Sequence, residues 1–456
     1  MRSVIAVVGL PAFMVSLDNL VVTNALPAMR NAFDASTGDL QWFVDAYTLP
    51  FAAFLLTAAV LGDRFGRRLV FVIGIAVFTC ASAACVLAPT AGALVVARAV
   101  QGSAGAVIMT LSLTLLVAGV PARRRALAIA LWSGFTGLGI AVGPVLGGAV
   151  VEGLEWTWIF WLNVPVGLIA AVLAGIHLRE SHGPPKRLDV MGMVLLAVSI
   201  LVMVWGVVEA PEHGWRSPRV LVALALGAAL FGAFLRWEAR SRQPMLPLRL
   251  FRSGAFSVVN ALSFTFNVGV FGSIFLLAQF FQVVQGDSPL QAGLRTVPCT
   301  LAPLVVGPLT GLLMPRWGAA RLILAGQVMV AVALFWMAAV FSPGVAFAVL
   351  VGPFLLAGVG LGLTYPPISA VVIEAVPEGE RGVAAGVNNS VREVGVAAGV
   401  AVLVSIFATT GGYTPAAFVD GLIPAIVTAA VIVAAGAALT GLLPGVRSVR
   451  EEARAL

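Results

Sequence analysis

Three ionisable side chains stand in long apolar stretches of this sequence, and they are the first candidates for chemistry. Asp18 lies in MVSLDNLVVTNALP, Asp45 in QWFVDAYTLP and Arg98 in LVVARAVQGSAG. Charged groups are costly inside a membrane, so those found there commonly bind a substrate, an ion or a proton. Asp18 either carries a proton or is a structural carboxylate paired with an arginine. Asp45 either faces the same cavity or meets water at the membrane surface.

Arg98 and the adjacent residues Arg392 and Glu393 call for partners within the spans. Arg98 needs an anionic partner or backbone carbonyls, and Asp18 and Asp45 are its nearest sequence candidates. It either holds the proton off the carboxylate until substrate binds or neutralises a buried acid. Arg392 and Glu393 are adjacent, so we expect them to point to different helix faces and to pair elsewhere. Structural gating on the cytoplasmic side and proton handling are equally open roles for them.

A short charged loop, Ala59–Arg68 (AVLGDRFGRR), separates two apolar stretches. Gly62 and Gly66 allow the backbone to turn there. The loop is predicted to be a cytoplasmic connector that pins two membrane spans together. Its gating candidates are Asp63, Arg64, Gly66 and Arg67.

Glycines recur every four residues at Gly139, Gly143 and Gly147, with Pro144 among them. This spacing places the three glycines on one helix face, where they permit close helix approach. Pro144 removes a backbone hydrogen bond and favours a bend. The stretch is therefore either plain helix packing or a kink that biases which side a cavity opens.

Amides and aromatic rings in the spans are candidates for a substrate cavity, because such surfaces suit flat, lipophilic cargo. Phenylalanine in a span nevertheless faces lipid or the protein core more often than a ligand. The cavity candidates are Asn24, Tyr47, Gln101, Asn260, Phe264, Asn267, Phe271 and Asn388.

The elements that carry these residues follow from composition. Of 456 residues, 60% are hydrophobic and 10% are charged, which excludes a soluble globular protein. The chain divides into fourteen apolar stretches of roughly 18 to 28 residues, each long enough to cross a bilayer as a helix. Most of the 27 lysines and arginines fall in alternate connectors, which predicts that both termini are cytoplasmic. The net charge of +7 thus reflects topology rather than nucleic-acid binding.

The second half of the sequence repeats the first. Gly139 and Gly143 return as Gly395 and Gly399, offset by 256 residues, and the charged loop has a weaker echo in Gly311–Gly326. We predict an all-α polytopic membrane protein of the major facilitator fold, with two six-helix bundles related as repeats. The predicted parts are a first bundle (1–180), an inserted helix pair with its connectors (181–252), a second bundle (253–444) and a cytoplasmic tail (445–456).

Several motifs together resemble the major facilitator superfamily, in particular its fourteen-helix drug:proton antiporter branch. LGDRFGRR resembles the superfamily's signature loop, and LDNLVVTNALP, ARAVQG, GIAVGPVLGG and WTWIFWLNVPVG are similar to the branch's motifs in helices 1, 4, 5 and 6. The resemblance implies that Asp63 and Arg67 lock an inward gate. It further implies that Gly143 and Pro144 mark an exporter. Pro315 stands where the second-half loop usually has an acid, so a second gate cannot use the same latch.

The leading interpretation is proton-coupled antiport of hydrophobic compounds, including cationic drugs and antibiotics, by alternating access between the two halves. No Walker-type phosphate loop is present, so the energy source is an ion gradient, and no cofactor or metal is expected. The alternative is a proton-coupled symporter or uniporter of a small metabolite. No convergent nucleophile group favours an enzyme. The expected partners are a lipophilic small molecule, protons and the bilayer of the cytoplasmic membrane, for a multi-pass protein that acts as a monomer.

Overall fold

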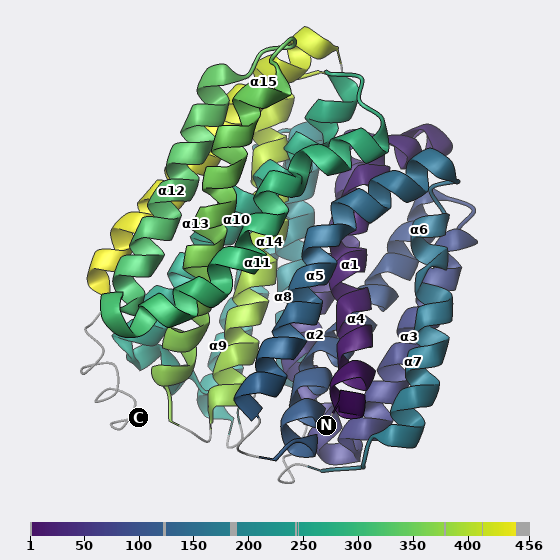
Figure 1. The fold of residues 1–456 in the computed structure, drawn as a ribbon, viewed down its shortest axis with the longest axis vertical. Helices are drawn as coiled ribbons and strands as arrows, with labels where there is room; N and C mark the ends of the chain where they lie inside the picture. Colours follow the sequence, from purple (N-terminus) through teal and green to yellow (C-terminus); the bar gives the residue numbers. More distant parts are fainter. Residues whose placement is uncertain are drawn as a thin grey trace. The chain divides into compact units, whose positions relative to one another are not determined.

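A computed structural model describes residues 2–121, 125–182, 189–241, 244, 246–377, 380–412 and 414–443. The predicted tail, 445–456, lies outside these ranges. Every regular element in the described part of the chain is a helix (Figure 1). In chain order these are α1 (Arg2–Phe33), α2 (Thr37–Phe65), α3 (Arg67–Val86), α4 (Ala91–Gly119), α5 (Arg125–Gly153), α6 (Trp158–Trp161), α7 (Asn163–His177), α8 (Val190–His213), α9 (Pro218–Arg240), η2 (Leu248–Arg252), α10 (Gly254–Val283), α11 (Pro289–Trp317), α12 (Ala319–Val340), α13 (Phe347–Glu374), α14 (Arg381–Thr410), α15 (Pro415–Leu439) and η4 (Thr440–Leu442).

The helices have the length and composition of membrane spans. Among the described residues, 13 helices are long and apolar enough to cross a membrane. The number rises to 14 when α2, which bends by 53° between its two parts, is taken as one span. Short α6 and the longer α7 together form one of these spans, Trp158–His177. The all-α polytopic fold predicted from the sequence is confirmed, while the cytoplasmic location of the termini remains a prediction.

The chain forms two compact units. The first comprises Met1–Leu201, Gly227–Met245 and Ser288–Gly293, and the second comprises Val202–Leu226, Leu246–Asp287 and Leu294–Leu456. Helices α1 to α7 thus belong to the first unit, and α10 and α12 to α15 belong to the second. The sequence predicted four consecutive segments, whereas these two units are each built from several separate segments. The four-part division stays a prediction.

Polar residues at helix starts set the boundaries of several spans. Ser36 and Asp39 form a reciprocal capping box at the start of α2, in which the Asp39 N–H donates to the Ser36 hydroxyl at 3.1 Å. Thr90 caps α4 through the Ala93 N–H at 3.2 Å. Ser253 caps α10 in the same way. These caps satisfy backbone donors that the first helical turn leaves without partners.

The sequence repeat reappears as a repeat of backbone conformation. Gly66 separates α2 from α3 with a φ of 106°, and Gly318 separates α11 from α12 with a φ of 79°. A residue with a side chain is strained in this region, so each tight connection depends on glycine. The weak loop echo thus marks equivalent turns in the two halves of the chain.

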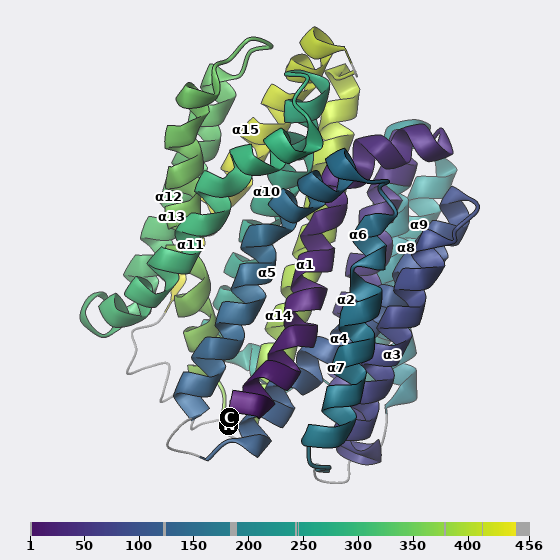
Figure 2. The same cartoon turned by 45° about the vertical axis from the view of Figure 1, so that its right-hand side comes forward.

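The repeated glycines have equivalent packing roles as well. α1 runs beside α5 in the first unit (Figures 1 and 2), and α10 packs on α14 in the second. A Cβ at Gly139 would lie 2.8 Å from the carbonyl oxygen of Phe13, and one at Gly395 would lie 2.9 Å from that of Phe264. Close helix contact therefore requires glycine at both positions.

Candidate functional site

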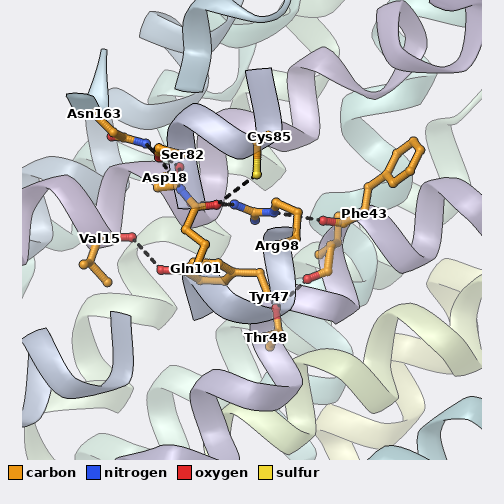
Figure 3. Close-up of polar contacts among 11 residues, drawn as sticks. Val15, Asp18, Phe43, Tyr47, Thr48, Ser82, Cys85, Arg98, Gln101 and Asn163 are labelled. Carbon is orange, nitrogen blue, oxygen red and sulfur yellow. Dashed lines mark hydrogen bonds and ion pairs between the residues drawn. The ribbon is translucent and has the colours of Figure 1, made fainter. Parts of the chain in front are cut away.

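The centre of the first unit holds a buried ion pair between α1 and α4. Arg98 Nη1 donates to Asp18 Oδ2 at 2.6 Å, and the two residues are 1% and 0% exposed (Figure 3). Of the two partners that the sequence offered Arg98, the structure selects Asp18. Two charges at this depth are tolerated only when they are paired and fully hydrogen-bonded.

Amides from α4 and α7 complete the bonding of Asp18. Gln101, one turn after Arg98 on α4, donates to Asp18 Oδ1 at 3.1 Å, and Asn163 at the start of α7 donates to the same oxygen at 2.7 Å. Ser82 of α3 accepts from both amides, at 2.6 and 3.1 Å. Three side chains from α4 and α7 therefore donate hydrogen bonds to the Asp18 carboxylate, which lies on α1.

Arg98 is held equally firmly. Its Nε donates to the carbonyl oxygen of Phe43 at 3.2 Å, and Nη1 also donates to Gln101 Oε1 at 2.7 Å. The guanidinium lies 4.3 Å above the centre of the Tyr47 ring, a cation–π contact. Tyr47 and Gln101, both candidates for lining a cavity, are fully buried. We refer to Asp18, Ser82, Arg98, Gln101 and Asn163 as the N-unit network.

Small residues allow the N-unit network to form. A Cβ at Gly102 would collide with the backbone carbonyl of Tyr47, so α4 approaches α2 closely only because this position is glycine. A Cβ at Gly167 on α7 would likewise collide with Thr79 on α3. Glycine at these two positions therefore allows the helices that carry the N-unit network to pack closely.

Asp45 has a different environment from Asp18. It lies on α2, is 0% exposed, and neither carboxyl oxygen has a hydrogen-bond partner in the described part of the chain. Gln41 lies one turn earlier on the same helix and is also fully buried, and neither polar atom of its amide has a hydrogen-bond partner among the described residues. The structure therefore does not bring Asp45 into the N-unit network.

The charged loop between α2 and α3 is ordered by carboxylates. Arg67 donates to Asp63 at 2.9 Å through Nε, with Nη2 at 2.8 Å from the same oxygen. Arg64 is exposed and lies over the Phe65 ring at 5.3 Å. The two residues proposed to form the gate thus contact each other directly within this unit.

Glu180, which follows α7, completes this loop and was not singled out from the sequence. Its carboxylate accepts from the N–H groups of Arg68 and Leu69, at 2.9 and 3.1 Å, at the start of α3. Partial burial raises the pKa of Glu180, but the N–H donors of Arg68, Ser181 and Leu69 and the charge of Arg68 outweigh it and hold the pKa below its ordinary value. Its only sequence signal was an acid just beyond a span.

The glycine-rich helix α5 packs its predicted face on α1. Cβ atoms at Gly139, Gly143 and Gly147 would each lie against α1, between Phe13 and Val21. α5 continues through Pro144 as one helix, and the Asn24 amide donates to the carbonyl oxygen of Pro144 at 2.6 Å. Helix packing is therefore established for this face, while an effect on gating stays a prediction.

A second polar cluster lies in the second unit, among α10, α13 and α14. The Asn388 amide donates to Asn260 Oδ1 at 3.1 Å, and the Tyr365 hydroxyl donates to Asn267 Oδ1 at 2.9 Å. Tyr365 also meets the Phe266 ring edge to face, with centroids 5.5 Å apart. Tyr365 was not among the predicted residues. The sequence did offer a signal, because Tyr365, in LGLTYPP, is the only tyrosine or tryptophan of α13. Phe264 and Phe271 are half-buried on α10.

The expectation that Arg392 and Glu393 pair elsewhere was wrong. Arg392 Nη2 lies 3.4 Å from Glu393 Oε1, because the long arginine side chain folds back toward its neighbour on α14. The guanidinium lies 5.7 Å from the centre of the Tyr365 ring. Glu393 is buried, and its Oε2 has no hydrogen-bond partner among the described residues.

Many apolar spans around buried polar clusters define a polytopic α-helical membrane protein. The sequence profile of the Major Facilitator Superfamily matches residues 8–400. The chain belongs to this superfamily of transporters and is not an enzyme.

Its similar curated relatives are resistance and efflux proteins. The chain is 37% identical over 402 residues to the multidrug resistance protein Stp of Mycobacterium tuberculosis, covering 88% of this chain and 74% of that protein. It is 35% identical to the tetracenomycin C resistance and export protein of Streptomyces glaucescens, with coverage of 89% and 76%. It is also 35% identical to the multidrug efflux pump LfrA of Mycolicibacterium smegmatis, with coverage of 88% and 80%.

Solved structures share the fold at low sequence identity. The human organic anion transporter MFSD10 aligns with a TM-score of 0.66 and 16% identity over 96% of this chain and 99% of that one. A D-xylose-proton symporter aligns with a TM-score of 0.65 and 15% identity, with coverage of 95% and 97%. At this identity the likeness establishes the fold alone.

Proposed function

We propose that this protein exports hydrophobic, drug-like small molecules across the cytoplasmic membrane in exchange for protons. The observation that carries the proposal is identity of 35–37% over nearly nine-tenths of the chain to proteins named for drug resistance and export. Transport proceeds by alternating access of the two units, uses the proton gradient and no cofactor, and is performed by a monomer.

Asp45 is the group that binds and releases the coupling proton. A carboxylate that is buried without a partner is costly when ionised, whereas the protonated form is neutral and far cheaper to bury. Asp45 meets this condition, since both its oxygens lack hydrogen-bond partners among the described residues. Glu393, with one oxygen lacking such a partner, supplies a second site in the other unit.

Asp18 and Arg98 then have a positioning role. Asp18 accepts from Arg98, Gln101 and Asn163, so its negative charge is compensated in this conformation. The pair fixes the rotation of α4 against α1, whereas the Asp45 carboxylate has no hydrogen-bond partner among the described residues. Asp63 and Arg67, with Arg64 and Gly66, form the cytoplasmic gate. Arg392 contributes to gating in the second unit.

The test is substrate-triggered proton movement in inverted membrane vesicles that have been acidified inside by respiration. A pH-sensitive dye reports proton efflux from the lumen when lipophilic cations and antibiotics are added. Wild-type vesicles should respond, and Asp45→Asn should abolish the response while the protein remains in the membrane at normal abundance. Asp34→Asn is the matched control, because Asp34 is exposed in the connector between α1 and α2.

The outcomes separate the alternatives. A response that survives in Asp45→Asn assigns the proton to another group, with Glu393→Gln as the next variant. Alkalinisation of the lumen that requires a small polar metabolite loaded inside the vesicles, with no response to drugs added outside, would instead support the symporter.

A further inference from the structure

Arg392 stands out because it is a partly exposed cation deep in a span. It lies nine residues inside the apolar span Val383–Thr410, which corresponds to about 14 Å along the helix axis. Its side chain is 36% exposed. Near the middle of a hydrocarbon layer about 30 Å thick, an exposed guanidinium does not face lipid. Arg392 therefore faces a polar or water-filled space.

The neighbouring residues support a wet surface on this side of α14. Asn389, one turn before Arg392, is also exposed. Residues three apart on a helix lie on the same face, so an amide and a guanidinium share this face within an otherwise apolar span. On α13, the Tyr365 ring lies beneath the guanidinium at 5.7 Å and is fixed by its hydrogen bond to Asn267.

Arg392 also has donors to spare. A guanidinium carries five N–H donors in a planar fork that matches a carboxylate. Among the described residues its hydrogen-bond acceptor is Glu393, through one Nη at 3.4 Å, which is close to the outer limit of a hydrogen bond. This contact is longer and weaker than the 2.6 Å ion pair between Arg98 and Asp18.

We propose that Arg392, Tyr365 and Asn267 form a subsite for the ionised acidic oxygen of an aromatic cargo, a carboxylate or a phenolate. Arg392 receives the anion through its free donors, and the cargo ring continues the stack that the guanidinium makes with Tyr365. Glu393 competes with the cargo for Arg392, so cargo binding displaces the weak contact between the two side chains. This inference rests on the proposed export function and adds acidic aromatic compounds to its substrates.

The test is equilibrium binding of a matched probe pair to the purified full-length protein in detergent. 2-Naphthoate carries the carboxylate, whereas 2-naphthamide has the same ring and a neutral group. Wild type should bind the naphthoate about tenfold more tightly, as expected for a hydrogen bond to a charged group. Arg392→Gln should reduce this preference to about onefold. Arg392→Lys should keep part of it, because lysine retains the charge without the fork.

Glu393→Gln is the control for a loss of structure in Arg392→Gln. It should raise naphthoate affinity by removing the competing carboxylate, and a misfolded protein would not show a gain in affinity. Equal binding of the two probes to wild type, or an unchanged preference in Arg392→Gln, would overturn the subsite. Drug-triggered proton efflux without a naphthoate preference would leave the proposed function standing and refute this inference. A naphthoate preference without such efflux would support the subsite and refute proton antiport.

Discussion

Asp18 and Asp45 are both buried aspartates of the first unit, but their surroundings give them different chemistry. Asp18 receives hydrogen bonds from Arg98, Gln101 and Asn163, whereas Asp45 receives none from the described residues. Burying a charge is costly unless hydrogen bonds or an opposite charge compensate it. The two aspartates therefore differ in the donors that surround them, and the proposed function assigns the coupling proton to Asp45.

This difference predicts that Asp18→Asn mainly destabilises the fold. It would leave Arg98 as a buried cation without an anion, which costs about 3–5 kcal/mol in buried pairs. We expect a lower apparent Tm and poor recovery of monodisperse protein, measured by thermal unfolding in detergent. Changing both partners, as Asp18→Asn with Arg98→Met, should recover part of the loss, because no charge is then left unpaired.

Asp34→Asn, at an exposed position, should leave the apparent Tm unchanged. If Asp18→Asn were as stable as wild type and yet lost proton coupling, Asp18 rather than Asp45 would be the proton carrier.

At the scale of elements, the start of α3 illustrates how a connector is fixed by a distant residue. Glu180, beyond α7, accepts from the N–H groups of Arg68 and Leu69, and the N–H of Arg67 donates to the carbonyl oxygen of Ser181 at 2.9 Å. A carboxylate at a helix N-terminus satisfies backbone donors and complements the helix dipole. The connector after α7 is thereby attached to the loop that carries Asp63 and Arg67.

This attachment should depend on pH. The pKa of Glu180 is lowered in the folded protein, so its stabilising contribution is complete above the ordinary glutamate value of 4.5 and is lost as the pH falls through the lowered folded value. Glu180→Gln should lower the apparent Tm at pH 7 by about 1–3 °C, a small effect because the group is partly solvated. The difference from wild type should shrink as the pH falls below 4.5.

Thermal unfolding at a series of pH values measures this, with Glu155→Gln as an exposed control in the connector before α6. An equal Tm for Glu180→Gln and wild type at pH 7 would show that the cap does not stabilise the loop.

At the scale of the whole molecule, the positive-inside pattern predicts an orientation that labelling can test. With both termini cytoplasmic, the connector between α12 and α13 lies outside and the connector after α7 lies inside. In a variant without native cysteines, Ser342→Cys should react with a membrane-impermeant maleimide on intact cells. His182→Cys should react only after the membrane is permeabilised. Both positions are exposed. The reverse pattern would invert the topology and with it the direction assigned to transport.

Sequence alone determined the features that depend on local composition. Hydrophobic runs of sufficient length must become spans, because lipid leaves the backbone no other partners. The turns at Gly66 and Gly318 could also be predicted from the sequence, because a tight connection between helices favours glycine. The glycine spacing in α5 likewise identified its packing face, because helical periodicity places residues four apart together.

Only the tertiary structure decided which distant side chains meet. Arg98 pairs with Asp18 across 80 residues rather than with Asp45, and Asn163 joins from 145 residues away. Ser82, Glu180 and Tyr365 had no distinctive spacing that marked them. Sequence periodicity gives the face of a helix on which a residue lies, but the rotation and contacts of neighbouring helices decide what that face touches. The pairing of buried charges is therefore a property of the packed helices.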